Sequence, residues 1–507
     1  MNILAPILAL LLSVNYTAGF HEGDWVNYLD FRYVTSVTMD QTIVYFGTTS
    51  GVLRYDRFDN TWLAPLTVTD GMPDQRVDNI AYDPSYDRVY VATPSGNAYY
   101  QLTFQQWYII SDFPSKLAHS DLKIPALGML TTPFGYTYQN GQITDLNFRS
   151  YRLTKGQDDG FNHLFTGTWG LGPIIINPRY GEIKLLPFGP YIEDVTALVR
   201  VGDNYWFGGG PGEGLEPGVS WCDKSLQEWH WYIPRYTGGL ASAQITSGLS
   251  DGKITWLGTD YGLVRYDMED DRFGSYTSLG LLPSKEVTSL AADSAWIYIG
   301  TANGLGFIHK EFDQKGGKHK KSADPPDSLK DTTETKAPLS PKNRLRGWHI
   351  NCLRMIDGYL YVGTDRGALR RPLDDYADFE MMNTPDNMLS TDVVDIAKSG
   401  DSYLFATDDD IVTINSKTGE SASITNRAYF GQWRIRQIIV DNQNIWAATS
   451  LGLWKYRIKD GYHRLFNEND GMLSSDIRSI ALDGDYIYMA TPKGAIRFYW
   501  NNPGRAD

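Results

Sequence analysis

A short unit of two strands recurs along the chain and constrains its fold more than any other feature. In the clearest copy, ITWLGTDYGLVRYD at 254–267, the first strand alternates large and small residues and ends at a tight turn. Gly262 can adopt the positive φ that such a turn needs, and the second strand returns as far as Asp267. Five further copies begin at residues 43, 296, 359, 444 and 486. Because a regular repeat sets the whole architecture, this unit governs the interpretation of the chain.

One strand precedes each unit and another follows it, which predicts a repeat of four antiparallel strands. The preceding strand ends in Asp, as in VTSLAAD at 287–293, and we expect this Asp to form an Asx turn. A connector such as NDGMLSSDI at 469–477 then leads to the next repeat, and its Met or Leu is expected to fill the seam between neighbouring sheets.

The spacing of the repeats predicts a β-propeller. The marker residues that end the first strand of the unit are spaced 42, 63, 43, 42 and 42 residues apart; they are Gly258, Gly300, Gly363, Ala406, Ala448 and Ala490. About forty residues per four-stranded unit is the period of a propeller blade. Earlier markers are Gly47, Ala92, Gly167 and Gly208, and a degenerate blade is expected around 120–150, with its best hairpin at Met129–Tyr138. The fold class is therefore all-β, with about eleven four-stranded antiparallel blades.

Eleven blades exceed the four to eight typical of one propeller, so we expect two propellers of roughly five and six blades. The last repeat stops after its third strand, near Trp500, and the N-terminus supplies a lone outer strand within 24–29. Pairing the two would close a ring and remove two exposed edges. Blades one to seven are expected over 20–310 and blades eight to eleven over 347–507, with chain crossings between the propellers at 310–346 and near 111–125.

Two segments fall outside the repeats. Residues 1–19 have an apolar stretch too short to span a bilayer, followed by small residues, which is typical of a signal peptide. Residues 311–346 are rich in Lys, Asp, Pro, Ser and Thr, which predicts a disordered basic insertion. Its lysines could touch an anionic surface, although a solvated loop is the simpler interpretation. The mature chain is expected to lack a membrane span and to be periplasmic or secreted.

Charge and cysteine content exclude some classes of protein. A net charge of −14 argues against nucleic-acid binding, which needs a basic face. Cys222 and Cys352 are the only cysteines and lie in different repeats. Export would permit a disulfide, but most such pairs in a ring are out of reach, so we expect two buried free thiols.

The repeat strings resemble the propeller repeats of two-component regulators, which belong to periplasmic ligand-binding sensors. The resemblance is carried by the Trp/Tyr-x-Gly-Thr…Gly-Leu-x-Arg-Tyr-Asp strings, best at 43–56 and 254–267, and by the Asp-Gly-Met-Pro/Leu connectors at 70–73 and 470–473. In that family an immunoglobulin-like domain, a membrane helix and a kinase follow the propellers. The chain ends seven residues after Trp500, so these parts are not expected here. The resemblance implies a secreted binding or interaction propeller.

Propeller ligands bind at one mouth of the central channel, where the connectors lie. The connector residues expected to face it are Arg76, Glu286, Asp392 and Asp476, although each could instead cap a strand end in solvent.

Two further features could belong to a binding site at this rim. Glu213 and Glu216, in the long turn GGGPGEGLEPG, could hold a cation, but two carboxylates are too few for calcium, and a flexible rim loop is the alternative. Trp169 could stack on a sugar or peptide, or it could pack against the neighbouring blade.

Signatures of catalysis are absent from the sequence. It has no His-Glu-x-x-His and no Gly-x-Ser-x-Gly motif, and we expect no catalytic residue, metal or cofactor. The expected function is an exported, non-catalytic propeller that binds a protein, peptide or glycan, with a cell-envelope component as one possible partner. The alternatives are a propeller enzyme, such as a lyase or glycan-active protein with its site at the channel mouth, and a structural part of an envelope machine.

Overall fold

The computed structural model describes residues 23–114, 117, 130–131, 136–139, 141–210, 216–277, 282–310, 345–373, 378–382, 391–425 and 433–503. The expected signal peptide, Glu213 and nearly all of the basic insertion lie outside these ranges. The described residues form ten antiparallel sheets and two short 3-10 turns, η1 (Val68–Asp70) and η2 (Glu468–Asp470), which confirms the prediction of an all-β propeller. None of the described helical segments is long and apolar enough to cross a bilayer.

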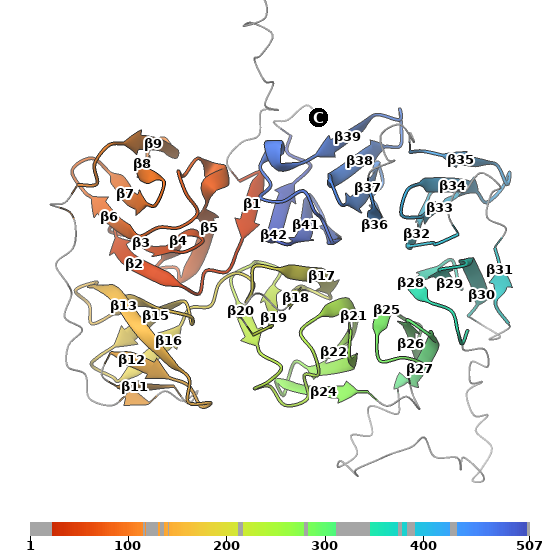
Figure 1. Ribbon diagram of the computed structural model, residues 1–507, viewed down its shortest axis with the longest axis horizontal. Helices are drawn as coiled ribbons and strands as arrows, with labels where there is room; N and C mark the ends of the chain where they lie inside the picture. The colour runs from red at the N-terminus through yellow and green to blue at the C-terminus, as the bar shows by residue number, and fades with distance from the viewer. Residues whose placement is uncertain are drawn as a thin grey trace, which may run out of the picture.

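Seven of the sheets pack side by side as a closed ring, which occupies the right of Figure 1. Six of its blades are continuous in sequence: β17 (Val195–Val201), β18 (Asn204–Gly209), β19 (Val219–Asp223) and β20 (Trp229–Tyr232); β21 (Ile245–Asp251), β22 (Ile254–Thr259), β23 (Gly262–Asp267) and β24 (Arg272–Tyr276); β25 (Val287–Ala292), β26 (Trp296–Thr301) and β27 (Gly304–His309); β28 (Ile350–Ile356), β29 (Tyr359–Thr364), β30 (Gly367–Pro372) and β31 (Glu380–Met381); β32 (Asp395–Ser399), β33 (Ser402–Ala406), β34 (Ile411–Asn415) and β35 (Ser421–Ser423); and β36 (Ile435–Val440), β37 (Asn444–Thr449), β38 (Gly452–Arg457) and β39 (His463–Phe466).

The seventh blade joins the two ends of the chain. It contains β40 (Ser479–Asp483), β41 (Tyr486–Thr491) and β42 (Gly494–Tyr499), and its outer strand is the N-terminal β1 (Trp25–Tyr28). β1 pairs with β42 in the register Trp25↔Phe498, the pairing that the half-blades at the chain ends predict. β40 and β41 also pack against β17, so the ring is complete.

Three sheets form an arc beside the ring, on the left of Figure 1. Their strands are β2 (Val34–Met39), β3 (Ile43–Thr48), β4 (Gly51–Asp56) and β5 (Thr61–Leu66); β6 (Asn79–Asp83), β7 (Arg88–Thr93), β8 (Gly96–Gln101) and β9 (Gln106–Ile110); and β10 (Leu130–Thr131), β11 (Thr137–Gln139), β12 (Gln142–Thr144), β13 (Ser150–Asp158), β14 (Leu164–Thr168), β15 (Pro173–Asn177) and β16 (Glu182–Leu185). Blade β2–β5 lies in the middle, with β6 packed on one side and β13 and β14 on the other.

This partition corrects two expectations. The hairpin expected as an eleventh blade does not form a separate sheet, because β10–β12 extend the sheet of β13–β16 to seven strands. The division is a ring of seven and an arc of three rather than five and six blades. The chain leaves the ring after β1 and returns to it before β17. The two expected crossings do not link the ring and the arc. The segment 310–346 joins β27 to β28, which belong to neighbouring ring blades, and the segment near 111–125 lies between β9 and β10 of the arc.

Hydrogen bonds at the central turn of the unit explain the recurring Gly-Thr…Gly string. Buried Thr259 Oγ1 donates to the carbonyl of Gly262 at 2.7 Å and accepts from the amide of Tyr261 at 3.2 Å. Gly262 has φ +117°, and a Cβ there would lie 2.6 Å from the carbonyl oxygen of Tyr276, so only glycine fits. The same Thr-to-Gly hydrogen bond recurs in six other blades, at Thr48, Thr93, Thr301, Thr364, Thr449 and Thr491.

The other two local predictions are also confirmed. Asp293 Oδ1 accepts from the amides of Ala295 and Trp296, which is the Asx turn expected at the end of the first strand. Connector residues Met72, Leu282 and Met472 are buried and belong to the hydrophobic clusters between neighbouring blades.

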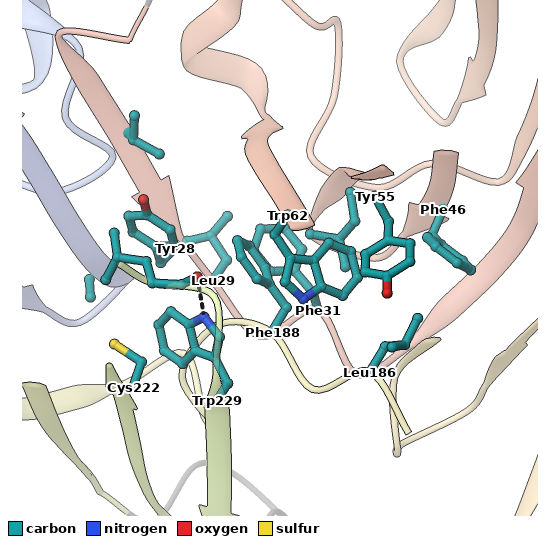
Figure 2. Close-up of a cluster of buried hydrophobic side chains, with 14 of the residues drawn as sticks. Tyr28, Leu29, Phe31, Phe46, Tyr55, Trp62, Leu186, Phe188, Cys222 and Trp229 are labelled. Atoms are coloured by element: carbon teal, nitrogen blue, oxygen red, sulfur yellow. Dashed lines mark hydrogen bonds between the residues drawn. The ribbon is translucent and has the colours of Figure 1, made fainter. Parts of the chain in front are cut away.

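One hydrophobic core unites the ring and the arc (Figure 2). Phe188, on the segment that returns to the ring, packs against Phe31 on the segment that leaves it and against Trp62 of the arc. It also packs against Tyr28 and Trp229 of the ring. All these side chains are buried. The two crossing segments also touch directly, because a Cβ at Gly189 (φ +81°) would lie 2.4 Å from the Leu29 carbonyl oxygen. The arc is therefore fused to the ring through side-chain packing and not merely tethered to it.

Candidate functional site

One residue per ring blade lies on the connector immediately before a buried Val or Ile that leads into the innermost strand. We call these the mouth positions; they are Asp194, Gln244, Glu286, His349, Asp392, Arg434 and Asp476. The apolar residues that follow them are almost fully buried; they are Val195, Ile245, Val287, Ile350, Val393, Ile435 and Ile477. Burial of these residues holds each connector down, so equivalent polar side chains gather at one rim of the ring.

Three acids at the mouth positions accept hydrogen bonds from the preceding blade. Asn351 Nδ2 donates to Asp392 Oδ1 at 2.6 Å, and Arg436 Nη1 lies 2.5 Å from Asp476 Oδ1. Arg478 Nη1 donates to Asp194 Oδ1 at 2.6 Å, and this contact joins the last blade to the first. We call these three contacts the rim clasps.

The donors of the rim clasps also bind backbone. Asn351, Arg436 and Arg478 each reach the carbonyl oxygen of the residue after their acid, at 3.0, 2.9 and 3.2 Å. Elsewhere on the rim Thr246 makes the same kind of bond to the Val287 carbonyl at 2.7 Å. Asp392 and Asp476 were expected as ligand-binding residues, and what the structure shows is that each contacts the neighbouring blade.

Other mouth positions carry side chains that the blades do not use. The carboxylate of Glu286, the guanidinium of Arg434 and the imidazole of His349 make no hydrogen bond or ion pair with described residues. Glu286 and Arg434 are exposed, and His349 is half-buried. The rim therefore presents groups of both signs on a backbone that the clasps hold in place.

The remaining expected residues are not mouth positions of the ring. Arg76 lies at the equivalent position in the arc, where its Nε is 2.7 Å from the carboxylate of Asp78. Glu216 pairs with Arg235 at 2.9 Å, and Glu213 lies outside the described residues.

Trp169, on the turn between β14 and β15, packs edge-to-face on Tyr33 of the neighbouring arc blade, with ring centroids 5.2 Å apart. Trp169 therefore packs against the neighbouring blade, which was one of its two expected roles, although 47% of its surface stays exposed.

Asp194, His349 and Arg434 were missed from sequence. The signal that could have found them is the polar residue directly before the Val or Ile that leads into each first strand, as in EDV at 193–195 and HI at 349–350. The connector motif was recognised only at 69–77, 279–287, 385–393 and 469–477, so the sequence pattern did not point to this position in the other connectors.

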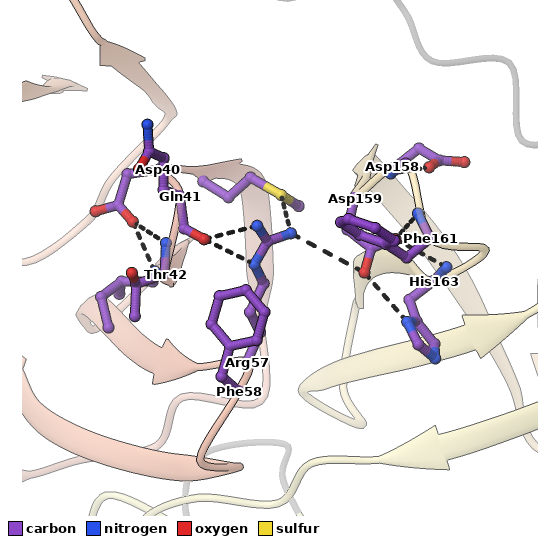
Figure 3. Close-up of polar contacts among 12 residues, drawn as sticks. Asp40, Gln41, Thr42, Arg57, Phe58, Asp158, Asp159, Phe161 and His163 are labelled. Atoms are coloured by element: carbon purple, nitrogen blue, oxygen red, sulfur yellow. Dashed lines mark hydrogen bonds and ion pairs between the residues drawn. The ribbon is translucent and has the colours of Figure 1, made fainter.

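A polar cluster that includes Arg57, Asp159 and His163 lies between two blades of the arc (Figure 3). Arg57 Nη1 lies 4.0 Å from Asp159 Oδ2, and Asp159 also accepts from the amides of Phe161 and His163 and contacts the His163 ring at 3.1 Å. Burial raises the pKa of Asp159, but these hydrogen bonds outweigh it and hold the pKa below its ordinary value. The cluster joins blade β13–β16 to blade β2–β5.

No metal centre is assembled among the residues that the structure describes. Within the described ranges, no three His, Cys, Asp or Glu side chains gather as metal ligands would. Cys222 and Cys352 are free and buried, as expected, and burial raises the pKa of Cys352 to about 12.

No family model matches the chain, and no curated protein matches it. Among solved structures, the extracellular domain of the putative one-component system BT4673 from B. thetaiotaomicron is similar, with 15% identity over 92% of this chain and 70% of that one and a TM-score of 0.47. PorZ, an essential surface component of the type-IX secretion system of Porphyromonas gingivalis, has 16% identity over 92% and 68%, with a TM-score of 0.46.

A third similar structure, the WD40 β-propeller domain of Doa1, has 10% identity over 62% of this chain and 95% of that one, with a TM-score of 0.42. The propeller assignment itself rests on the sheets of this chain. Extracellular domains of putative hybrid two-component systems are also among the similar solved structures.

Proposed function

We propose that the protein is an exported, non-catalytic propeller that binds a protein, peptide or glycan partner at the mouth of its seven-bladed ring. One observation carries the proposal: the side chains of Glu286, His349 and Arg434 make no hydrogen bond or ion pair with described residues, yet they stand at equivalent positions on a rim held by the clasps. Polar groups that do not serve the fold, on loops positioned by a rigid scaffold, are typical of binding sites.

The charge pattern at the mouth supports a polar partner. A rim with one exposed carboxylate, one exposed guanidinium and one imidazole can make charge-assisted hydrogen bonds to groups of either sign. The rigid rim lowers the entropy lost on binding, because the backbone of the loops is already ordered. We further propose that the partner is met outside the cytoplasm, in the periplasm or cell envelope or beyond it, because residues 1–19 have the composition of a signal peptide.

The proposal is tested by capture of partners from envelope and secreted fractions on the immobilised full chain. The variant Glu286→Lys with Arg434→Glu reverses both exposed charges without touching a clasp. Lys417→Glu is the control, because Lys417 is exposed and pairs with Asp401 on a turn away from the mouth positions. A partner retained by the wild type and the control but lost from the double variant supports the proposal, whereas equal retention by all three contradicts it.

A further inference from the structure

Blade β6–β9, at one end of the arc, has one covered face and one open face (Figure 1). Val89, Val91, Ala98 and Tyr100 pack towards blade β2–β5 and are buried. The opposite face carries Tyr90 on β7, Tyr99 on β8 and Tyr108 on β9. In the part of the chain that the structure describes, no further blade covers this face.

The open face is an ordered aromatic ladder. Tyr90 pairs with Tyr99 and Tyr99 with Tyr108 in the strand register, and their ring centroids are 5.6 and 5.1 Å apart. The guanidinium of Arg88 lies over Tyr99 at 4.2 Å and over Tyr86 at 5.1 Å. Of these rings, Tyr86 is 64% and Tyr108 is 39% exposed. We call Tyr86, Arg88, Tyr90, Tyr99 and Tyr108 the tyrosine face.

Side-chain hydrogen bonds fix the cation of the tyrosine face. Arg88 Nε donates to Gln101 Oε1 at 2.8 Å, and Gln101 Nε2 donates to the carbonyls of Tyr86 and Asp87 at 3.1 and 3.2 Å. A rigid patch of Tyr and Arg is the composition that dominates binding energy in protein interfaces. Because these side chains are already ordered in the free protein, binding of a partner to them would cost little conformational entropy.

The fold itself indicates what shape covers such a face. In the ring, each blade face is covered by another blade, and β37 is buried along its whole length, whereas β7 alternates buried and half-exposed residues. The matching surface is therefore a second blade face, and a second copy of the chain supplies one. The tyrosine face also contains both halves of a reciprocal contact, because Arg88 of one copy can lie on the Tyr rings of the other in a two-fold arrangement.

We propose that two copies of this protein associate through the tyrosine face, with blade β6–β9 of each copy packed on that of the other. A buried aromatic side chain removes roughly 150–250 Å² from water, so partly exposed rings from two copies make a small interface, and we expect a dissociation constant of about 1–100 μM. This proposal does not depend on the proposed binding site at the ring mouth, because the mouth positions lie on other blades.

Sedimentation velocity of the full chain across this concentration range tests the proposal. We expect a reversible monomer–dimer equilibrium that Arg88→Glu and Tyr99→Ser each weaken by about tenfold or more. Tyr180→Ser is the matched control, since Tyr180 is 69% exposed on a turn of blade β13–β16 and should leave the equilibrium unchanged. A wild type that stays monomeric throughout, or a dimer that both variants retain, overturns the proposal.

Cross-linking gives a second readout that does not depend on the stability of those variants. Both native cysteines are buried, so a thiol introduced by Tyr108→Cys is the accessible one. A short bismaleimide should join two copies of this variant but not two copies of Tyr180→Cys. Equal cross-linking of the two variants would place the contact elsewhere and overturn the proposal.

Discussion

The ring and the arc are built from the same repeat and differ in how their blade faces are covered. In the ring, residues of β37 are buried on both sides of the sheet, because a blade lies against each face. In the arc, β7 is buried on alternate residues only, and its other side carries the tyrosine face. Closure therefore supplies each ring blade with two neighbours, whereas the arc depends on the core it shares with the ring. Four substitutions, in order of decreasing expected effect, test this difference.

The largest effect is expected where the ring closes. Trp25 is buried on β1 and stacks on Phe498 of β42 with centroids 3.8 Å apart. Trp25→Ala removes this contact and weakens the strand that completes the seventh blade, so we expect a loss of about 3–5 kcal/mol in unfolding free energy. Urea denaturation measures it. Trp169→Ala is the control, because it removes the same kind of side chain from a half-exposed position in the arc. If Trp169→Ala lowered the unfolding free energy as much as Trp25→Ala, ring closure would not explain the effect of Trp25→Ala.

The next effect concerns the junction. Phe188→Ala should cost about 3 kcal/mol and separate the unfolding of the arc from that of the ring, because Phe188 contacts both. Differential scanning calorimetry should show two transitions in place of one. The control is Phe405→Ala, which removes a fully buried ring of the same size between β28–β31 and β32–β35. If both variants unfold in one transition, the shared core does not couple the two parts.

A smaller effect is expected within the arc. Asp159→Asn weakens the contact with Arg57 and should cost about 1 kcal/mol at neutral pH. Because the folded-state pKa of Asp159 lies below its ordinary value, its contribution is present above about pH 4 and is lost as the pH falls through the folded pKa. The difference between wild type and variant, followed by urea denaturation against pH, should therefore shrink on acidification. Asp59→Asn, at an exposed position of the neighbouring blade β2–β5, should differ little from wild type at any pH.

The smallest effect is expected at the rim clasps. Asp476→Ala removes a half-exposed ion pair with Arg436 but leaves the bond of Arg436 to the Ile477 carbonyl, so we expect a loss of at most about 1 kcal/mol. Asp78→Ala removes the corresponding pair of the arc, Arg76–Asp78, which lies within one connector and joins no blades. The urea midpoint should fall further for Asp476→Ala than for Asp78→Ala. A larger fall for Asp78→Ala would show that the clasps do not hold the ring.

Which residues lie at the rim of the ring could be predicted in part from sequence, but the contacts that these residues make could not. The connectors with a Met or Leu identified Glu286, Asp392 and Asp476 as rim residues, and all three occupy mouth positions of the ring. The same pattern could not show that Asn351 and Arg436 reach Asp392 and Asp476 from the preceding blade, because those contacts join residues about forty positions apart. For the same reason Arg76 was grouped with residues of a ring to which it does not belong.

The sequence by itself determined the blade, its central turn and the closure of the last blade by the first strand. The turn follows from short-range chemistry, because Thr259 and Gly262 lie three residues apart. The blade follows from the spacing of the marker residues, since about forty residues are enough for four strands. Only the tertiary structure decided how many blades close into a ring. All blades use similar strings, so the string does not specify which blade lies beside which, whereas packing of Phe188 and Gly189 against the segment after β1 directs the chain out of the ring and back.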